Sequence, residues 1–233
     1  MTTSYITATS TIHDGNMSLK LGDELTVLAH RHQFLQSQGS DWLRHICMRC
    51  DHGDAIVMVS GDTLVDQYRM IDAEVLVTTD PTLTLMLLTA DCLPVTFFDP
   101  VQRVLALAHF SRQTIAAHLP TETIAFLQTN NDVDPITLEV HIGPHIHAAS
   151  YRFSLPLPHV DPVIAPFITE RDGFAYIDLT AATVAQLTAA GIQKNNITID
   201  PADTGTDDRY FSYYRTKHEN RPDGRIATIA GMH

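Results

Sequence analysis

The sequence predicts an α/β domain in which helices cover sheets. Short runs of β-branched and apolar residues occupy the middle of the chain, and helical repeats flank them. Several runs, such as Leu85–Leu88, are apolar at every position, which is typical of strands buried on both faces. No fixed-period repeat, low-complexity tract or Gly/Ser linker divides the 233 residues, so we expect one domain over residues 1–233.

Two helices are predicted from apolar spacing and from their end signals. Glu24–Gln38 carries leucines at helical spacing and stops before Gly39, a residue suited to the position after a helix. In Ala181–Ala190, small and apolar residues recur on one face, Thr180 can cap the start, and Gly191 ends the run.

A third helix and seven strands complete the expected elements. Gln113–Gln128 has helical spacing, and Pro120 should break it, with Thr121 as the cap of a new start. The strands are expected from runs of Val, Ile, Leu, Phe and Thr between turn residues. These runs are Ala55–Val59, Val75–Thr79, Leu83–Thr89, Val95–Phe98, Val104–Ala108, Thr137–Ile142 and Ile197–Ile199.

Net charge excludes several classes of partner. The chain has 15 Lys and Arg against 27 Asp and Glu, a formal net charge of −12, and no basic run concentrates positive charge. Such a surface repels phosphate backbones, so we expect no nucleic-acid partner. The first residues lack a basic segment followed by an apolar one, and no window reaches ~18 uninterrupted apolar residues. We therefore expect no membrane partner and a cytoplasmic location.

The cysteines favour a reducing compartment, because three thiols cannot all pair within one chain. Cys47, Cys50 and His52 imitate half of a zinc site, but no second half follows, so a closed structural zinc is not expected. On this reasoning Cys47 and Cys50 are incidental. The 13 histidines are the unusual feature of the composition.

A carboxylate and a thiol interrupt the apolar segment Thr89–Val95. Asp91 should accept several hydrogen bonds if it is buried, either as part of a site or as a structural cap of a turn. Cys92 could be an inert core thiol, but His109 ends the next strand, and adjacent strands joined by a short connection bring such ends together. A thiolate beside an imidazole can form a zinc site or a nucleophilic Cys/His pair.

Two further groups carry candidate chemistry. His145 and His147 would face the same side of an extended strand, which suits metal or anion binding, although two solvated histidines after a turn are the alternative. Arg215 and Arg225 lie near hydroxyl groups in the sequence and could bind phosphate or carboxylate, although an aromatic strand with exposed charges is equally consistent.

Ordered short motifs along nearly the whole chain resemble the YfiH family, also called the laccase-domain or polyphenol-oxidoreductase family. The most specific of them is Thr89–Val95, which reproduces the family's TADCxPV. The other matching segments are Met17–Gly22 for SLNLG, Val59–Gly61 for VHG, Ala108-His109 for AHAGWRG, Ile142–Pro144 with Tyr151 for GPxIG, Asp178-Leu179 with Gln186-Leu187 and Gly191 for a helical pattern, and Phe211–Arg215 with Gly224-Arg225 for FSYRRD…GR.

This resemblance implies a fold and a metal. The fold would be a layered α/β/β/α sandwich with mixed sheets, similar to that of YfiH-like cysteine hydrolases. The family's zinc is held by the His of VHG, the Cys of ADC and the His of AHAGWRG. Here Cys92 and His109 match two ligands, Ser60 stands in the place of the third, and His145 or His147 could replace it.

The resemblance also implies a small-molecule substrate. Members of the family are similar to zinc-dependent purine nucleoside phosphorylases that act on adenosine and inosine, with adenosine deaminase activity. Cys92, His109 and Asp91 would then be the catalytic group, and Asp91 could orient a neighbouring ligand. Purine nucleoside and phosphate would be the partners, with Arg112, Ser212 and Arg215 holding phosphate or substrate.

Two other hypotheses remain open from the sequence. The chain could be a relative that kept the fold but lost the metal and acts as a binding or accessory protein, because Ser60, Gln113 and Tyr214 depart from the family pattern. It could also be a hydrolase with Cys92 as nucleophile and His109 as base. Copper-laccase chemistry is disfavoured, because it needs clustered His-x-His pairs. The sequence has only His30-Arg31-His32 and His145-Ile146-His147.

Overall fold

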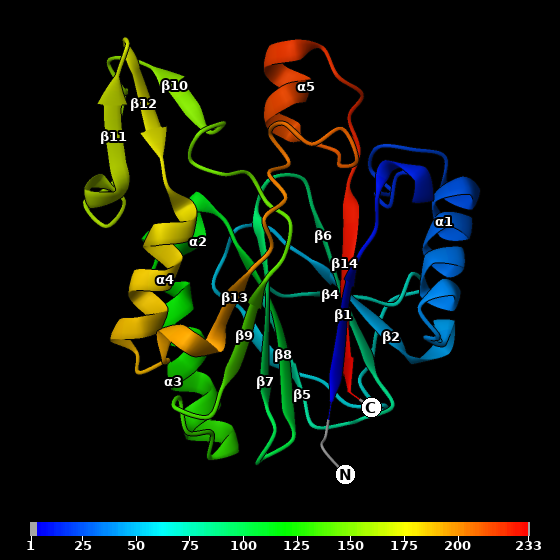
Figure 1. Cartoon of the computed structure of the whole chain (residues 1–233). Helices are drawn as coiled ribbons and strands as arrows, with labels where there is room; N and C mark the ends of the chain where they lie inside the picture. Colours follow the sequence, from blue (N-terminus) through cyan, green and yellow to red (C-terminus); the bar gives the residue numbers. More distant parts are fainter. Residues whose placement is uncertain (1–3, 233) are drawn as a thin grey trace.

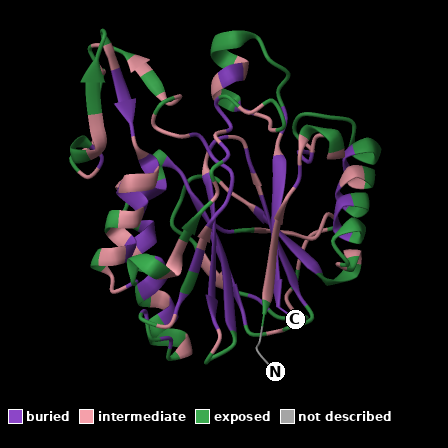
Figure 2. Cartoon of the chain, viewed as in Figure 1, coloured by how far each residue is buried: buried purple, intermediate pink, exposed green. Residues whose placement is uncertain are grey.

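Two mixed sheets lie face to face in the computed structural model, which describes residues 4–232, and helices cover their outer faces. In Figure 1 the helices α2, α3 and α4 lie on the left of the two sheets and α1 lies on the right. Figure 2 shows that the strands between these helices are mostly buried. The predicted α/β/β/α sandwich is therefore confirmed.

The first sheet packs against helix α1. Its strand order is β1 (Tyr5–Thr9), β14 (Ile226–Met232), β6 (Thr84–Thr89), β2 (His45–Arg49) and β4 (Met70–Asp72). Strand β2 runs parallel to both β6 and β4, whereas the other pairs are antiparallel. Helix α1 (Glu24–Ser37) buries Phe34 and Leu35 against Met86 and Ile229 of this sheet. The helix predicted at Glu24–Gln38 is thus present.

The second sheet packs against three helices. Its strand order is β13 (Ile197–Ile199), β9 (Glu139–Ile142), β7 (Leu93–Asp99), β8 (Val104–Phe110), β5 (Val75–Thr78) and β3 (Ile56–Met58). The covering helices are α2 (Arg112–Ala116), α3 (Leu119–Asn131) and α4 (Leu179–Ala189). Each strand predicted from the sequence is present in one of these two sheets. Burial of apolar surface stabilises a fold by about 25 cal/mol per Å². The apolar side chains packed between the layers are therefore the main source of stability of this fold.

Three connections cross from the first sheet to the second at one end of the sandwich. The chain passes from β2 to β3, from β4 to β5 and from β6 to β7. Because β2, β4 and β6 are parallel to one another, their carboxyl ends share one edge, and β8 ends at the same edge. Ligands of open α/β sheets commonly bind outside the carboxyl ends of strands. These crossings carry the candidate site.

Alternation along strand β8 decides which of its side chains reach that site. Leu105 and Leu107 belong to the core between the sheets, and Ala106 and Ala108 belong to the core beneath the helices. Successive side chains of a strand point to opposite faces. His109 therefore lies on the same face as Leu107, at the open end of the space between the sheets.

Two details of the helices differ from the prediction. Asp178, not Thr180, caps α4, because its carboxylate accepts the N–H of Ala181 at 2.8 Å. The predicted helix at 113–128 divides at His118, which has a φ of 63°, so the restart at Thr121 is wrong. Pro120 lies in the first turn of α3, where its missing N–H costs no hydrogen bond.

Elements with mixed or short patterns were missed. Strand β2 contains His45 and Arg49, whose polar side chains hide its strand pattern. A third sheet of β10 (Arg152–Ser154), β12 (Phe174–Ile177) and β11 (Ile168–Arg171) lies near helix α5 (Tyr213–Glu219) at the upper end in Figure 1. The aromatic segment before Arg215 is thus a helix start rather than a strand. Within residues 4–232, no helix combines the length and apolar character needed to cross a bilayer.

Candidate functional site

Glu74 and His109 form the buried base of the site. His109 Nδ1 lies 2.6 Å from Glu74 Oε2, and the side chains are 5% and 1% exposed. Their backbones are also joined, since the His109 N–H donates to the Glu74 carbonyl at 2.8 Å. A carboxylate that accepts from Nδ1 fixes the ring and leaves Nε2 for a metal or for a proton.

Asp91 fixes the turn that carries Cys92. Asp91 has a φ of 88°, and its two carboxylate oxygens accept from Thr204 Oγ1 at 2.7 Å and from the Tyr214 N–H at 2.6 Å. Burial raises the pKa of Asp91, although these hydrogen bonds oppose the shift. The prediction that Asp91 accepts several hydrogen bonds is confirmed. Since both oxygens are occupied, Asp91 acts by positioning the turn.

Cys92 follows this turn directly and lies beside His109. Strands β7 and β8 are antiparallel, with Pro94 opposite His109, so the end of one strand meets the beginning of the other. Cys92 and His109 line the same cavity, and the charge of Cys92 raises the pKa of His109. The neighbourhood of these two residues, expected from their strand ends, is therefore present.

His52 enters the site on the loop from β2 to β3. Its ring centroid lies 5.2 Å from that of His109, and its Nδ1 lies 3.1 Å from Ser111 Oγ. The backbone N–H groups of Asp51 and His52 donate to Glu74 Oε1 at 2.8 and 2.7 Å. One carboxylate thus holds both the loop of His52 and the ring of His109.

The assignment of Ser60 to the third ligand position is wrong. Ser60 lies beyond β3, at the end of the sheet where Val59 bonds to Val77, whereas His109 bonds to Glu74 at the other end. Ser60 is five residues along the chain from Ala55, or about 16 Å at ~3.3 Å per residue. His52-Gly53, the only His-Gly pair in the sequence, occupies the site instead. His52 is therefore the histidine that lies beside His109 at this end of the sheet.

Cys50 also belongs to the site, contrary to the expectation that it is incidental. Its Sγ, a carboxylate oxygen of Glu74 and a ring nitrogen of His109 all lie within 4.8 Å of one another. Cys47 packs on the opposite side of the first sheet and is fully buried, and this burial raises its pKa to about 11. Cys47 and Cys50 therefore pack on opposite sides of the sheet.

His145 and His147 do not join the site. His145 is buried, with Nδ1 2.7 Å from the Gly143 carbonyl and Nε2 2.7 Å from Thr180 Oγ1, so neither ring nitrogen is free. His147 packs against His145 at a ring separation of 4.7 Å. Neither residue lines the cavities described below, so the proposed replacement of a ligand by either of them is not supported by their positions.

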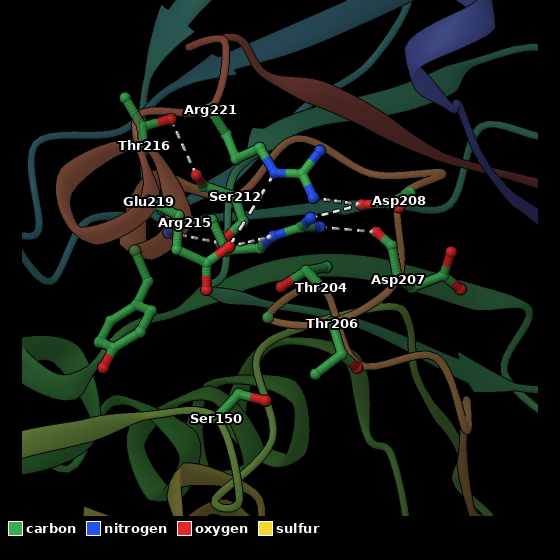
Figure 3. A network of polar contacts seen from close by, with 12 residues as sticks. Ser150, Thr204, Thr206, Asp207, Asp208, Ser212, Arg215, Thr216, Glu219 and Arg221 are labelled. Carbon is green, nitrogen blue, oxygen red and sulfur yellow. Dashed lines mark hydrogen bonds and ion pairs between the residues drawn. The ribbon is translucent and has the colours of Figure 1, made fainter.

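Arg215 and Ser212 are occupied in a separate polar network, which Figure 3 shows. The Arg215 guanidinium pairs with Asp208 and Glu219 and donates to the Asp207 carbonyl, while Ser212 Oγ accepts the Arg215 N–H at 3.2 Å as the cap of α5. Neither residue lines the cavities at the site. Their assignment to phosphate is therefore not supported, because the acidic partners already neutralise the arginine.

Two cavities meet at the site. The larger, about 770 Å³, is lined by Cys50, Cys92, His52 and His109 together with Arg31 and Lys20. The smaller, about 270 Å³, is lined by Tyr151, Phe153, Tyr214 and Arg112, and it shares His52 and Cys92 with the larger one. Arg112 lies 5.6 Å from the centre of the Phe153 ring. The thiol and imidazole groups thus lie between a cationic cavity and an aromatic one.

Charge at the site is concentrated on buried groups. Burial alone would lower the pKa of His109, but the neighbouring Cys92, Cys50 and Glu74 raise it well above 6.5. Burial raises the pKa of the Cys50 thiol, although His109 opposes the shift. Burial and the charge of His109 lower the pKa of His52. The site therefore favours a positive centre among its sulfur and carboxylate groups, whether a proton or a metal ion.

Arg31 is a buried cation in the larger cavity that the sequence analysis did not assign. It is 1% exposed, its Nε donates to the Met17 carbonyl at 2.7 Å, and its Nη1 is buried without a hydrogen-bond partner. In residues 4–232, no carboxylate lies within ion-pair distance of it. An arginine inside a predicted amphipathic helix gives little signal, since such residues are commonly solvated.

Thiol, imidazole and carboxylate groups lie at the open end between the two sheets of this α/β/β/α sandwich. The protein is therefore a layered α/β protein with a candidate metal centre. The chain belongs to the multi-copper polyphenol oxidoreductase laccase family, whose model matches residues 3–233. The histidines of the two His-x-His pairs do not line the cavities at the site.

Curated relatives carry a different functional name. A purine nucleoside phosphorylase of Mycobacterium tuberculosis is 29% identical over 226 residues, which cover 93% of this chain and 84% of the relative. One from Staphylococcus saprophyticus is 32% identical over 181 residues, covering 73% and 64%. Solved structures confirm the fold. YlmD from Geobacillus stearothermophilus has a TM-score of 0.86 at 24% identity, covering 97% of this chain and 91% of that one. YfiH from Bacillus licheniformis has a TM-score of 0.79 at 24% identity, covering 93% and 85%.

Proposed function

We propose that this protein is a zinc-dependent purine nucleoside phosphorylase that acts on inosine and adenosine. One observation carries the proposal: His52 and Cys92 line both a cationic cavity and an aromatic cavity, and His109 lies beside His52 in the cationic one. Phosphorolysis brings a nucleoside and a phosphate ion together at one carbon atom, the ribose C1′. Two adjoining cavities can hold the two reactants on either side of that atom. The names of the curated relatives support the same substrate class.

The donor set fits zinc. Two imidazoles and a thiolate are ligands that zinc prefers, and a carboxylate bound to the second nitrogen of a ligating histidine is a common supporting group. Glu74 has this relation to His109. A zinc ion held by His52, Cys92 and His109 would supply a Lewis acid that polarises an oxygen or nitrogen of the substrate.

The aromatic cavity suits a purine. Tyr151, Phe153 and Tyr214 lie with ring centroids 4.9 to 6.3 Å apart, and a purine ring can stack on or abut such faces. Arg112 lies at the same cavity and has no carboxylate partner among the described residues, so it can donate to an acceptor on the base. We assign Arg112 to the substrate on this ground.

The cationic cavity suits phosphate. Arg31 and Lys20 line it, and a buried guanidinium without a carboxylate is strongly stabilised by an anion. In the reaction, a phosphate oxygen bonds to the ribose C1′ as the glycosidic C–N bond breaks. The bond electrons and a proton go to the purine, so the products are ribose 1-phosphate and the free base. Positive charge develops on the sugar, and the negative charge of the incoming phosphate stabilises it.

The experiment combines metal analysis with a product assay. Protein purified without a His-tag is analysed for zinc and assayed for release of hypoxanthine from inosine and of adenine from adenosine, with and without phosphate. The proposal expects bound zinc and phosphate-dependent release, and conversion of adenosine to inosine would add deamination. Metal-free protein without phosphorolysis would reject it.

A second candidate function is a cysteine hydrolase. Cys92 lines the same cavity as His109, and His109 pairs with Glu74, so the three residues supply the thiol, imidazole and carboxylate that can activate a nucleophilic cysteine. This hypothesis expects activity that survives complete removal of metal by a chelator and that disappears in Cys92→Ala. Activity that requires added zinc would reject it.

A further inference from the structure

We infer that Cys50 contributes a second thiolate to the proposed metal centre, so that the chain offers His52, His109, Cys92 and Cys50. The inference rests on the proposed zinc site and goes beyond it. The resemblance that suggested the metal accounts for three ligands, and it assigns no role to Cys50.

Strand geometry aims Cys50 at the centre. In β2, Met48 packs in the core between the sheets, and Cys50 lies two residues further on the same face and contacts the same core. Cys47 lies on the opposite face with α1. Side chains two residues apart share a face of a strand, and side chains three residues apart lie on opposite faces. Cys50 and Cys47 therefore point to opposite sides of the sheet.

The Cys50 sulfur lies close to His109 and lines the same cavity as His52 and Cys92. Its Sγ lies within 4.8 Å of both a His109 ring nitrogen and a Glu74 oxygen. Ligands of one zinc ion, bound at about 2.0 to 2.3 Å each, lie roughly 3.3 to 4 Å apart in a tetrahedral set. The separation of Cys50 Sγ from the His109 nitrogen therefore exceeds this ligand spacing by at most about 1.5 Å.

The free donor in this cluster is the thiol rather than the carboxylate. Glu74 Oε2 is occupied by His109 Nδ1, and Oε1 accepts two backbone N–H groups of the loop at residues 51–52. The Cys50 thiol is in no disulfide, and within residues 4–232 it makes no hydrogen bond to a backbone group. Thiolate is also a preferred ligand of zinc, and two thiolates with two imidazoles are a frequent set.

A second thiolate has a consequence for access. Four protein ligands fill a tetrahedral zinc ion and leave no position for an exchangeable ligand, whereas three leave one open. Substrate would therefore reach the ion only when Cys50 leaves it or when the ion becomes five-coordinate, so Cys50 would set access to the Lewis acid of the proposed reaction.

Cobalt substitution counts the thiolates directly. Metal-free protein is loaded with Co²⁺, and the near-ultraviolet charge-transfer absorption, which arises from thiolate bound to cobalt, is measured per bound ion. Native protein, Cys50→Ala, Cys92→Ala and Cys47→Ala are compared. Cys47→Ala is the matched control, because Cys47 is a neighbouring cysteine on the other face of the strand.

The inference expects the absorption to fall by half in Cys50→Ala and in Cys92→Ala, and to stay unchanged in Cys47→Ala. It also expects zinc affinity to fall more than about tenfold in Cys50→Ala, since a lost ligand should cost at least as much as a lost outer partner. Full absorption in Cys50→Ala would overturn it.

The remaining outcomes separate this inference from the proposed function. If Cys50→Ala does not fold, Cys92→Ala decides: half of the absorption must remain if Cys50 is a ligand, and none if it is not. Complete loss in Cys92→Ala rejects the role of Cys50 while the three-ligand centre stands. Native protein that binds no Co²⁺ rejects both the zinc centre and the role of Cys50.

Discussion

Oε2 of Glu74 lies 2.6 Å from Nδ1 of His109, and the same carboxylate accepts the backbone N–H of His52 through Oε1. A single buried side chain on the crossing from β4 to β5 thus positions two imidazoles from two other segments. Removal of its charge should therefore loosen the proposed metal centre without removal of any ligand.

Glu74→Gln tests this relationship. The amide keeps the size of the side chain, but it loses the negative charge that supports His109. We expect zinc affinity to fall about 10- to 100-fold, the usual effect of such outer partners. Competition with a chromophoric chelator measures the affinity, and Glu139→Gln, an exposed position on β9, is the control. Unchanged affinity in Glu74→Gln would show that the carboxylate does not support a metal ligand.

As pH rises, the stability contributed by the Glu74–His109 contact should decrease in the metal-free protein, whereas the stabilisation by bound zinc should increase. In the metal-free protein the pKa of His109 is raised, so the stability from its contact with Glu74 is complete below about pH 6.5. That stability is lost as pH rises through the raised pKa. Zinc needs the unprotonated ring and the thiolate, so its binding strengthens over the same range.

Thermal unfolding between about pH 6 and pH 9, with and without zinc, measures both effects. The metal-free midpoint should fall relative to that of Glu74→Gln as pH rises, and the stabilisation by zinc should increase. Parallel curves for the two metal-free proteins would contradict the role given to the Glu74–His109 pair.

Arg31→Gln should weaken phosphate binding selectively. Loss of a hydrogen bond between charged groups costs about 1.5 to 3 kcal/mol, so the KM for phosphate should rise roughly 10- to 100-fold with little change in the KM for inosine. Steady-state kinetics with each reactant varied in turn give both values. Arg44→Gln, an exposed position outside the cavities, is the control. An equal rise in the KM for inosine and in the KM for phosphate would show that Arg31 does not bind phosphate selectively.

Arg215→Gln should affect stability and leave phosphate binding intact. The variant loses its contacts with Asp208 and Glu219 and a backbone hydrogen bond, which together contribute about 1 to 3 kcal/mol. Denaturant unfolding measures the loss, and the KM for phosphate should remain that of the native enzyme. A large rise in this KM with unchanged stability would restore the sequence-based assignment of Arg215 to phosphate.

The sequence allowed prediction of the layers and of half of the site. Apolar runs identified the strands of the second sheet, and the ends of β7 and β8 brought Cys92 and His109 together, because a short antiparallel connection has little freedom. Asp91 was also recognisable, since a carboxylate between buried strands must be hydrogen-bonded.

The other half depends on crossings between the two sheets. His52 and Glu74 follow strands of the first sheet, and their approach to His109 is decided by which strands become parallel neighbours. Short polar strands such as β2 do not reveal that pairing. The motif at Val59–Gly61 shared two letters with the family pattern but lacked the histidine, whereas His52-Gly53 carries the histidine that lies beside His109.

The zinc content of three proteins tests the central claim most directly. Native protein, His52→Ala and Ser60→Ala are purified without a His-tag, checked for folding by circular dichroism, and analysed for zinc per chain. The account predicts zinc in the native protein and in Ser60→Ala and its loss in His52→Ala. Loss of zinc in Ser60→Ala, or full zinc in His52→Ala, would contradict it.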